Sequence, residues 1–174
     1  MAKVLPTAES DLIAKLLEGQ AEEFFRGSEA LYTGQGFHAG DSAYFLRLMA
    51  IELYFKLLYL RETEALIFGH DLREIFDVMP SATRDALFAS FNRNLNSPIQ
   101  LKEFREWLKY LGNLFVQIRY PFEEFREMSQ AEYEAKLQRF EQAADDDLSE
   151  ASIIYHMPRV EALLAAVRES TDME

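Results

Sequence analysis

The feature that most constrains the fold is a regular spacing of apolar residues, at intervals of three and four, in the second half of the chain. Between residues 99 and 119 this spacing selects Leu101, Phe104, Leu108, Leu111, Phe115 and Ile118. Residues three and four apart share one face of an α-helix, so the pattern predicts a helix with one face in a core. Ser97-Pro98-Ile99-Gln100 supplies a capping residue and a first-turn proline, and Pro121 predicts an end near Arg119.

A second segment, residues 41–61, is apolar nearly all round, which is typical of a helix buried among several others. Its polar exceptions include Glu52 and Lys56, which lie one helical turn apart in the favourable order and are expected to pair. An earlier helix is predicted over residues 8–32, because leucine, isoleucine and phenylalanine recur along one side of it. Glycines at 34, 36 and 40 then separate the two helices.

Polar residues mark the starts of further helices. Asp71-Leu72-Arg73-Glu74 is a capping box, in which an aspartate caps the helix and a glutamate three residues later reaches back. It opens a short helix that Pro80-Ser81 ends, and the same pair is expected to cap the next helix, which runs to about Asn94. Ser129-Gln130-Ala131-Glu132 is another capping box and opens a charged helix to about residue 144.

A last helix is predicted over residues 148–168, and no run of alternating polar and apolar residues indicates a strand. The fold class that follows is all-α: an up-down helical bundle of four to five principal helices with a short helical insert. A chain of 174 residues is long enough for one domain, so residues 1–174 are read as a single unit. Its core covers residues 8–120 and the final helix, and residues 122–147 form a charged insert.

Composition limits what such a bundle does. The chain has 18 Lys and Arg against 30 Asp and Glu, a net charge of −12, which disfavours non-specific binding of nucleic acid. The absence of cysteine excludes disulfides, thiolate metal sites and thiol nucleophiles. Residues 43–60, the most apolar stretch, contain three charges, so a membrane-spanning helix is not expected. The first residues lack a signal-peptide core, and we therefore expect an intracellular, cytoplasmic protein.

No metal or cofactor is expected. A di-iron bundle needs glutamate three residues before histidine, and here His38, His70 and His156 follow Gln, Ile and Ile at that spacing. The three adjacent aspartates at 145–147 point in different directions and are interpreted as a solvated linker.

Three short motifs resemble one known family. Ile51-Glu52-Leu53, with Lys56 and Leu58, is followed by Gly69-His70-Asp71-Leu72 and then by a long helix ending in Arg119-Tyr120. Together they resemble the HEPN superfamily, α-helical domains named for their occurrence in higher eukaryotes and prokaryotes and for nucleotide binding. The resemblance covers about residues 10–120, and the final helix expected after residue 148 fits it.

The resemblance implies a helical bundle that pairs into a homodimer, with a polar groove near the interface. Many members are metal-independent ribonucleases of toxin–antitoxin, defence or RNA-processing systems, and others are binding modules encoded beside a nucleotidyltransferase, which acts as the antitoxin. The groove residues that it implies here are Glu52, Lys56, His70, Arg119 and Tyr120. Lys56 and Arg119 would meet phosphate, and Tyr120 would stack on a base.

The ribonuclease members carry an arginine followed, after four to six residues, by a histidine. After Arg119 this chain has Glu124, Phe125 and Arg126 in those positions instead. We therefore expect a non-catalytic module that binds a nucleotide, an RNA or a partner protein, with a basic partner favoured by the net charge. The alternative is a metal-independent RNase toxin with a rearranged site, in which Arg119 acts with His70 or His156. A scaffold whose polar residues serve folding alone is the third interpretation.

Overall fold

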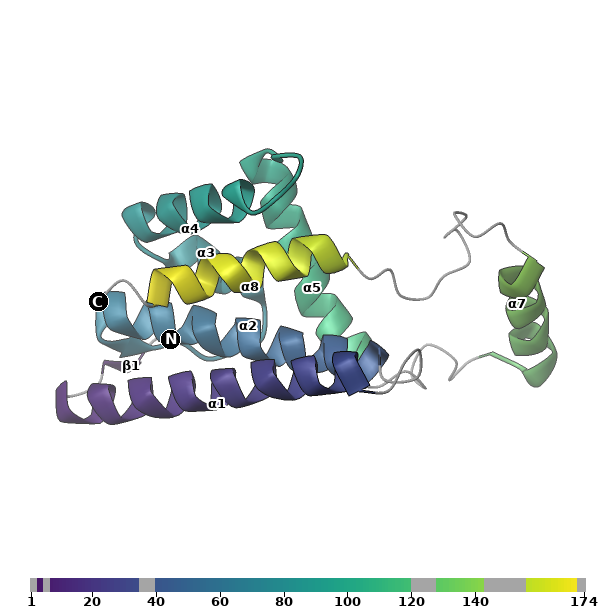
Figure 1. Cartoon of the computed structure of the whole chain (residues 1–174), viewed down its shortest axis with the longest axis horizontal. Helices are drawn as coiled ribbons and strands as arrows, with labels where there is room; N and C mark the ends of the chain where they lie inside the picture. The colour runs from purple at the N-terminus through teal and green to yellow at the C-terminus, as the bar shows by residue number, and fades with distance from the viewer. Residues whose placement is uncertain (1–2, 5–6, 35–39, 120–127, 143–155, 172–174) are drawn as a thin grey trace.

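The computed structural model describes residues 3–4, 7–34, 40–119, 128–142 and 156–171. The fold is all-α, as the sequence predicted. The helices are α1 (Thr7–Gly34), α2 (Gly40–Thr63), α3 (Leu72–Val78), α4 (Ser81–Arg93), α5 (Leu101–Arg119), α7 (Gln130–Gln142) and α8 (Met157–Thr171). The helices other than α7 form a bundle, while α7 lies apart from them (Figure 1). Two short strands, β1 (Lys3–Val4) and β2 (Ala65–Leu66), pair antiparallel beside them, with Lys3 opposite Leu66.

Helix α2 is the centre of the bundle, which confirms the prediction of a helix buried among several others. Helices α1, α8, α3 and α5 all pack against it. Eleven of its apolar side chains are buried: Ala43, Tyr44, Leu48, Ala50, Ile51, Tyr54, Phe55, Leu57, Leu58, Tyr59 and Leu60. Apolar area removed from water in this way contributes about 25 cal/mol per Å², so α2 supplies much of the stability of the fold.

Ion pairs at both ends of α2 fix the directions of its neighbours. Near its start Arg47 contacts Glu29, at the end of α1, whereas near its end Arg61 contacts Glu18, in the first half of α1. Helices α1 and α2 therefore run antiparallel. Arg61 also donates to the Thr171 carbonyl at the end of α8, at 2.7 Å, so α8 runs parallel to α2, as Figure 1 shows.

One predicted helix start and one predicted helix cap are wrong. Helix α5 begins at Leu101 and not at Ser97, because the Asn92 side chain bonds both the N–H and the carbonyl of Ile99 and holds that segment outside the helix. Ser81 does not cap α4 either. The cap position is Pro80, which makes no side-chain hydrogen bond to the helix, and Ser81 is the first helical residue.

The final helix is also shorter than the predicted 148–168. It begins at Met157, His156 lies outside it, and residues 143–155 are not among those described. Pro158 explains the late start, since a proline ring is accepted in the first turn of a helix but clashes with the preceding turn further in. The capping box of α7 is confirmed: the Ser129 backbone N–H donates to Glu132 Oε2 at 2.8 Å, and the Glu132 N–H donates to Ser129 Oγ at 3.3 Å.

Candidate functional site

The predicted pair of Glu52 and Lys56 forms on α2. Lys56 Nζ lies 2.6 Å from Glu52 Oε1, and the exposed fractions of the two side chains are 16% and 7%. Charges removed from water to this extent are stable only when their partners satisfy them. The ammonium group is therefore engaged within the protein, and Glu52 has a second carboxylate oxygen for another donor.

That further donor is His70, which the sequence placed in a loop eighteen residues away. His70 Nδ1 lies 2.9 Å from both carboxylate oxygens of Glu52. An ionised carboxylate only accepts hydrogen bonds, so Nδ1 carries the proton of the neutral ring and Nε2 carries the lone pair. The His70 side chain is 59% exposed. Glu52 thus holds a largely accessible imidazole in one tautomer.

Helix α5 holds the same imidazole from a second side. The ring of His70 stacks on that of Phe115, with centroids 5.4 Å apart and 12° between the planes. Phe115 in turn stacks on Phe45 of α2 at 5.3 Å and 24°. The backbone of α5 comes close as well, because a Cβ atom added at Gly112 would lie 3.5 Å from the His70 carbonyl oxygen. Both α2 and α5 therefore position His70.

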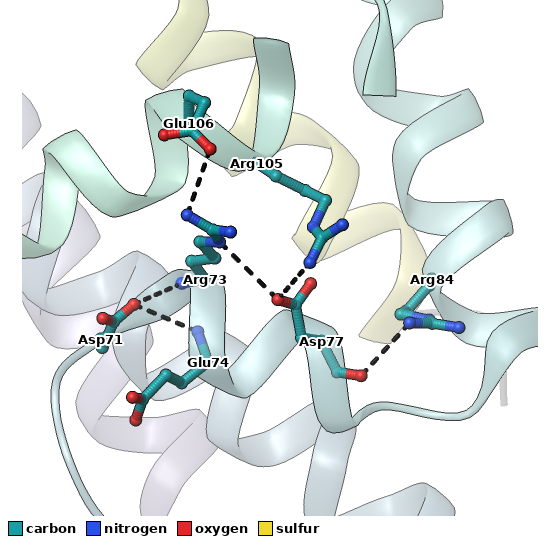
Figure 2. Close-up of polar contacts among 7 residues, drawn as sticks. All are labelled: Asp71, Arg73, Glu74, Asp77, Arg84, Arg105 and Glu106. Atoms are coloured by element: carbon teal, nitrogen blue, oxygen red, sulfur yellow. Dashed lines mark hydrogen bonds and ion pairs between the residues drawn. The ribbon is translucent and has the colours of Figure 1, made fainter. Parts of the chain in front are cut away.

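The loop that carries His70 is shaped by the residues on either side of it. Gly69 has φ of +108°, a backbone conformation that side chains with a Cβ rarely adopt. Asp71 caps α3, and its Oδ1 accepts from the backbone N–H groups of Arg73 at 2.9 Å and Glu74 at 3.1 Å. The predicted cap is confirmed, and it fixes the chain immediately after His70 (Figure 2).

Ion pairs attach α3 to α5 and so limit the movement of this loop. Arg105 Nη2 of α5 lies 2.7 Å from Asp77 Oδ2 of α3, and Arg73 Nε lies 3.7 Å from the same oxygen. Arg73 also reaches Glu106 at 3.1 Å (Figure 2). Sequence analysis missed this cluster, because its members come from two helices whose facing sides no local pattern reveals.

Of the other predicted site residues, Arg119 is the last residue of α5, but its side chain and all of Tyr120 lie outside the described residues. Helical geometry still assigns Arg119 a face. At about 100° per residue it lies about 40° around the helix from Phe115, the residue under His70, and about 180° from Tyr110. Arg119 therefore shares a face of α5 with the His70 contact.

His156, the other predicted candidate, approaches α5 from a different direction. Its ring meets Tyr110 edge-on, with centroids 5.9 Å apart and 76° between the planes. Burial lowers the pKa of His156, and the nearby Arg159 lowers it further. The two histidines therefore contact different faces of α5, because Phe115 and Tyr110 lie about 140° apart around the helix.

Among the described residues, no three His, Asp or Glu side chains converge as metal ligands would. The aspartates at 145–147 are outside that set. None of the helices described is both long and apolar enough to cross a membrane. Comparison with protein-family models, with curated proteins and with solved structures gives no match to this chain, so the HEPN resemblance rests on the sequence motifs.

Proposed function

We propose that this chain is a HEPN-like domain that binds the phosphate group of a nucleotide or an RNA at the surface around His70, without cleaving it. The observation that carries the proposal is the contact of His70 Nδ1 with Glu52 at 2.9 Å, which holds an exposed ring in place. When the ring is protonated, His70 would offer a charge-assisted Nε2–H donor to phosphate, and Arg119, one helical turn after Phe115 on α5, would supply a second positive charge.

The charges around His70 support phosphate binding despite the net charge of −12. Glu52 would by itself repel an anion, but Lys56 lies 2.6 Å from it and offsets its charge. With a neutral His70 the three groups sum to zero charge, and with a protonated His70 they sum to one positive charge. Over a few ångströms such a local charge outweighs the field of distant surface carboxylates, which salt screens within a Debye length of about 8 Å.

A second candidate function is metal-independent cleavage of RNA, and the same Glu52–His70 contact favours it. A carboxylate on Nδ1 leaves Nε2 to act as a general base, as in other carboxylate-oriented histidines. Nε2 would take the proton of a ribose 2′-hydroxyl, and the 2′-oxygen would attack the adjacent phosphorus. The bond to the 5′-oxygen then breaks, leaving a cyclic phosphate, and the protonated His70 returns its proton to that oxygen.

The deciding experiment measures binding and cleavage on the same samples. Fluorescently labelled short RNA and a labelled adenine nucleotide are titrated with wild-type protein in the presence of EDTA, and the RNA is then run on a gel. We expect His70→Gln to weaken binding about tenfold, the loss of one charge-assisted hydrogen bond. His156→Gln is the matched control, since it removes an imidazole on another side of α5, and we expect binding to stay as in the wild type.

Each result separates the candidates. Binding by the wild type without cleavage supports the binding module, and cleavage that His70→Gln and Arg119→Ala both abolish supports the ribonuclease instead. If neither RNA nor nucleotide binds, or if His156→Gln is as damaging as His70→Gln, the proposal is wrong. The implied homodimer and a nucleotidyltransferase-type partner are further proposals, tested by light scattering and by co-purification of the two proteins.

A further inference from the structure

A second site lies between α1, α2 and α8 and shares no residue with the His70 surface. It is a cavity of about 360 Å³, at the lower end of the range for pockets that hold small molecules. Phe25 and Tyr32 of α1, Arg47 of α2, and Ala165 and Arg168 of α8 line it. A cavity of this size, with two arginines and two aromatic rings in its wall, has the composition of a binding pocket for a small polar molecule.

Arg47 is the unusual residue of the cavity, because it is 3% exposed and yet incompletely bonded. Its Nη2 lies 2.5 Å from Glu29, whereas its Nη1 donates to the sulfur of Met157 at 3.9 Å and lies 3.7 Å from Glu161, beyond hydrogen-bond distance. No hydrogen-bond partner of its buried Nε is found in the part of the chain that the structure describes. A buried donor without an acceptor costs about 1–3 kcal/mol, and a thioether sulfur is only a weak acceptor for Nη1, so this buried guanidinium is under-bonded.

The two aromatic rings each stack against a guanidinium. The Arg47 guanidinium carbon lies 4.8 Å from the centroid of the Tyr32 ring, and that of Arg168 lies 4.3 Å from the centroid of Phe25. Stacking of this kind holds a guanidinium in place while its edge stays available to an oxygen ligand. Tyr32 is 57% exposed, so its ring lies at the entrance rather than in the core.

The charges of the wall define the ligand. Arg47 and Arg168 contribute two positive charges, Glu29 and Glu161 contribute two negative ones, and Arg168 also lies 3.3 Å from Glu22. A simple anion would be repelled by the carboxylates at the entrance, and a simple cation would be repelled by the guanidinium of Arg47. A zwitterion avoids both repulsions, since its negative end can face Arg47 and its positive end can face Glu161.

We propose that this cavity binds a free α-amino acid with an apolar side chain. The α-carboxylate accepts from Arg47 Nη1, whose hydrogen-bond acceptor among the described residues is the weakly accepting sulfur of Met157. The ammonium group pairs with Glu161, which is loosely held and more than half exposed. The apolar side chain packs against Leu164 and Phe25, which line the same space.

Isothermal titration calorimetry on the full chain tests the proposal with leucine and phenylalanine as the probes. We expect saturable binding at millimolar concentration or below. The N-acetyl derivatives lack the ammonium group and the amides lack the carboxylate, so both are expected to bind at least about tenfold more weakly. An N-acetyl derivative that binds as tightly as the free amino acid would overturn the proposal, as would the absence of saturable heat with every probe.

Two variants locate the binding. Ala165→Trp fills the cavity from its exposed side and is expected to abolish binding, while Ala86→Trp, the same change at an exposed position of α4 away from the cavity, is expected to leave it unchanged. Circular dichroism checks that both fold. Glu161→Gln alters only an exposed side chain and is expected to weaken binding about tenfold even if the tryptophan variant does not fold. Wild-type affinity in Glu161→Gln would contradict the assignment of the ammonium group.

Discussion

The ring of His70 lies nearly parallel to that of Phe115 on α5, with 5.4 Å between the centroids. The Nδ1 atom of the same ring bonds Glu52 on α2. One side chain is thus gripped by α2 through charge and by α5 through stacking. The two stacked rings differ in burial: the ring of Phe115 is buried in the core, whereas that of His70 is largely exposed. This difference separates the residues that hold the site from the residue that faces solvent.

Phe115→Ala and His70→Ala are therefore expected to differ strongly in their effects on stability. Phe115→Ala removes a buried ring that packs on both His70 and Phe45, and a phenylalanine removed from a core costs about 3–5 kcal/mol in the free energy of unfolding. His70→Ala removes an exposed hydrogen-bond partner of Glu52, and an exposed polar contact is worth about 1 kcal/mol or less. Urea unfolding followed by circular dichroism measures both, and equal losses would contradict this division of roles.

Glu52→Gln is expected to destabilise the fold by about 1–3 kcal/mol, because it leaves the Lys56 ammonium group largely buried without its counter-charge. Lys56→Met is the partner substitution and keeps the length of the side chain. If the two residues interact as the 2.6 Å distance indicates, the double variant loses less stability than the two single losses added together. Chemical denaturation of the four proteins gives the coupling energy, and strict additivity would show that the pair contributes nothing.

Local sequence patterns predicted the helices and the caps at Asp71 and Ser129, because a cap and a helical period depend on residues three or four apart. The pairing of Glu52 with Lys56 was predictable for the same reason. The contact of His70 with Glu52 was not, since its geometry depends on how the loop after β2 folds back on α2 and α5. Arg47 shows the same limit, as its partners Glu29 and Glu161 come from two other helices.

Two glycines near His70 are expected to respond in opposite ways to alanine. Gly112 lies inside α5, and a Cβ there would meet its neighbours at 3.5 Å, an ordinary contact distance. Gly112→Ala should therefore be neutral or stabilise by up to about 1 kcal/mol, the helix-propensity difference. Gly69→Ala forces a Cβ onto a backbone at φ of +108° and should destabilise by more than about 1 kcal/mol. Thermal unfolding compares them, and a stabilised Gly69→Ala would contradict the loop conformation.

His156 is expected to make the fold less stable in mild acid. Its pKa in the folded protein lies below the ordinary value of 6.5, because burial and Arg159 disfavour the charged ring. As the pH falls, His156 is therefore protonated in the unfolded chain before it is protonated in the folded protein. The contribution of the neutral ring to the free energy of unfolding is complete above pH 6.5 and is lost as the pH falls through the folded-state pKa. His156→Gln should remove this part of the pH dependence. Unfolding midpoints measured across this range test it, and parallel curves for the two proteins would contradict it.

Tyr54 gives the corresponding prediction in alkali. Its buried hydroxyl donates to Glu22 at 2.9 Å, and burial, together with that carboxylate, raises the pKa of Tyr54 from 10.0 to about 12. Between these pH values the unfolded chain gives up the proton while the folded protein retains it. The contribution of Tyr54 to the free energy of unfolding is therefore complete below pH 10 and is lost as the pH rises through 12, by about 2–3 kcal/mol in all.

Tyr54→Phe lacks the ionisable group and loses only the hydrogen bond, about 1 kcal/mol at neutral pH. The advantage of the wild type should therefore shrink above pH 10 and then reverse, because only its unfolded state gains from ionisation at this position. Urea unfolding of both proteins at a series of pH values checks this, and the other tyrosines, which both proteins share, cancel in the comparison. A constant difference in the free energy of unfolding across the series would contradict the prediction, because Tyr54 would then ionise as readily in the folded protein as in the unfolded chain.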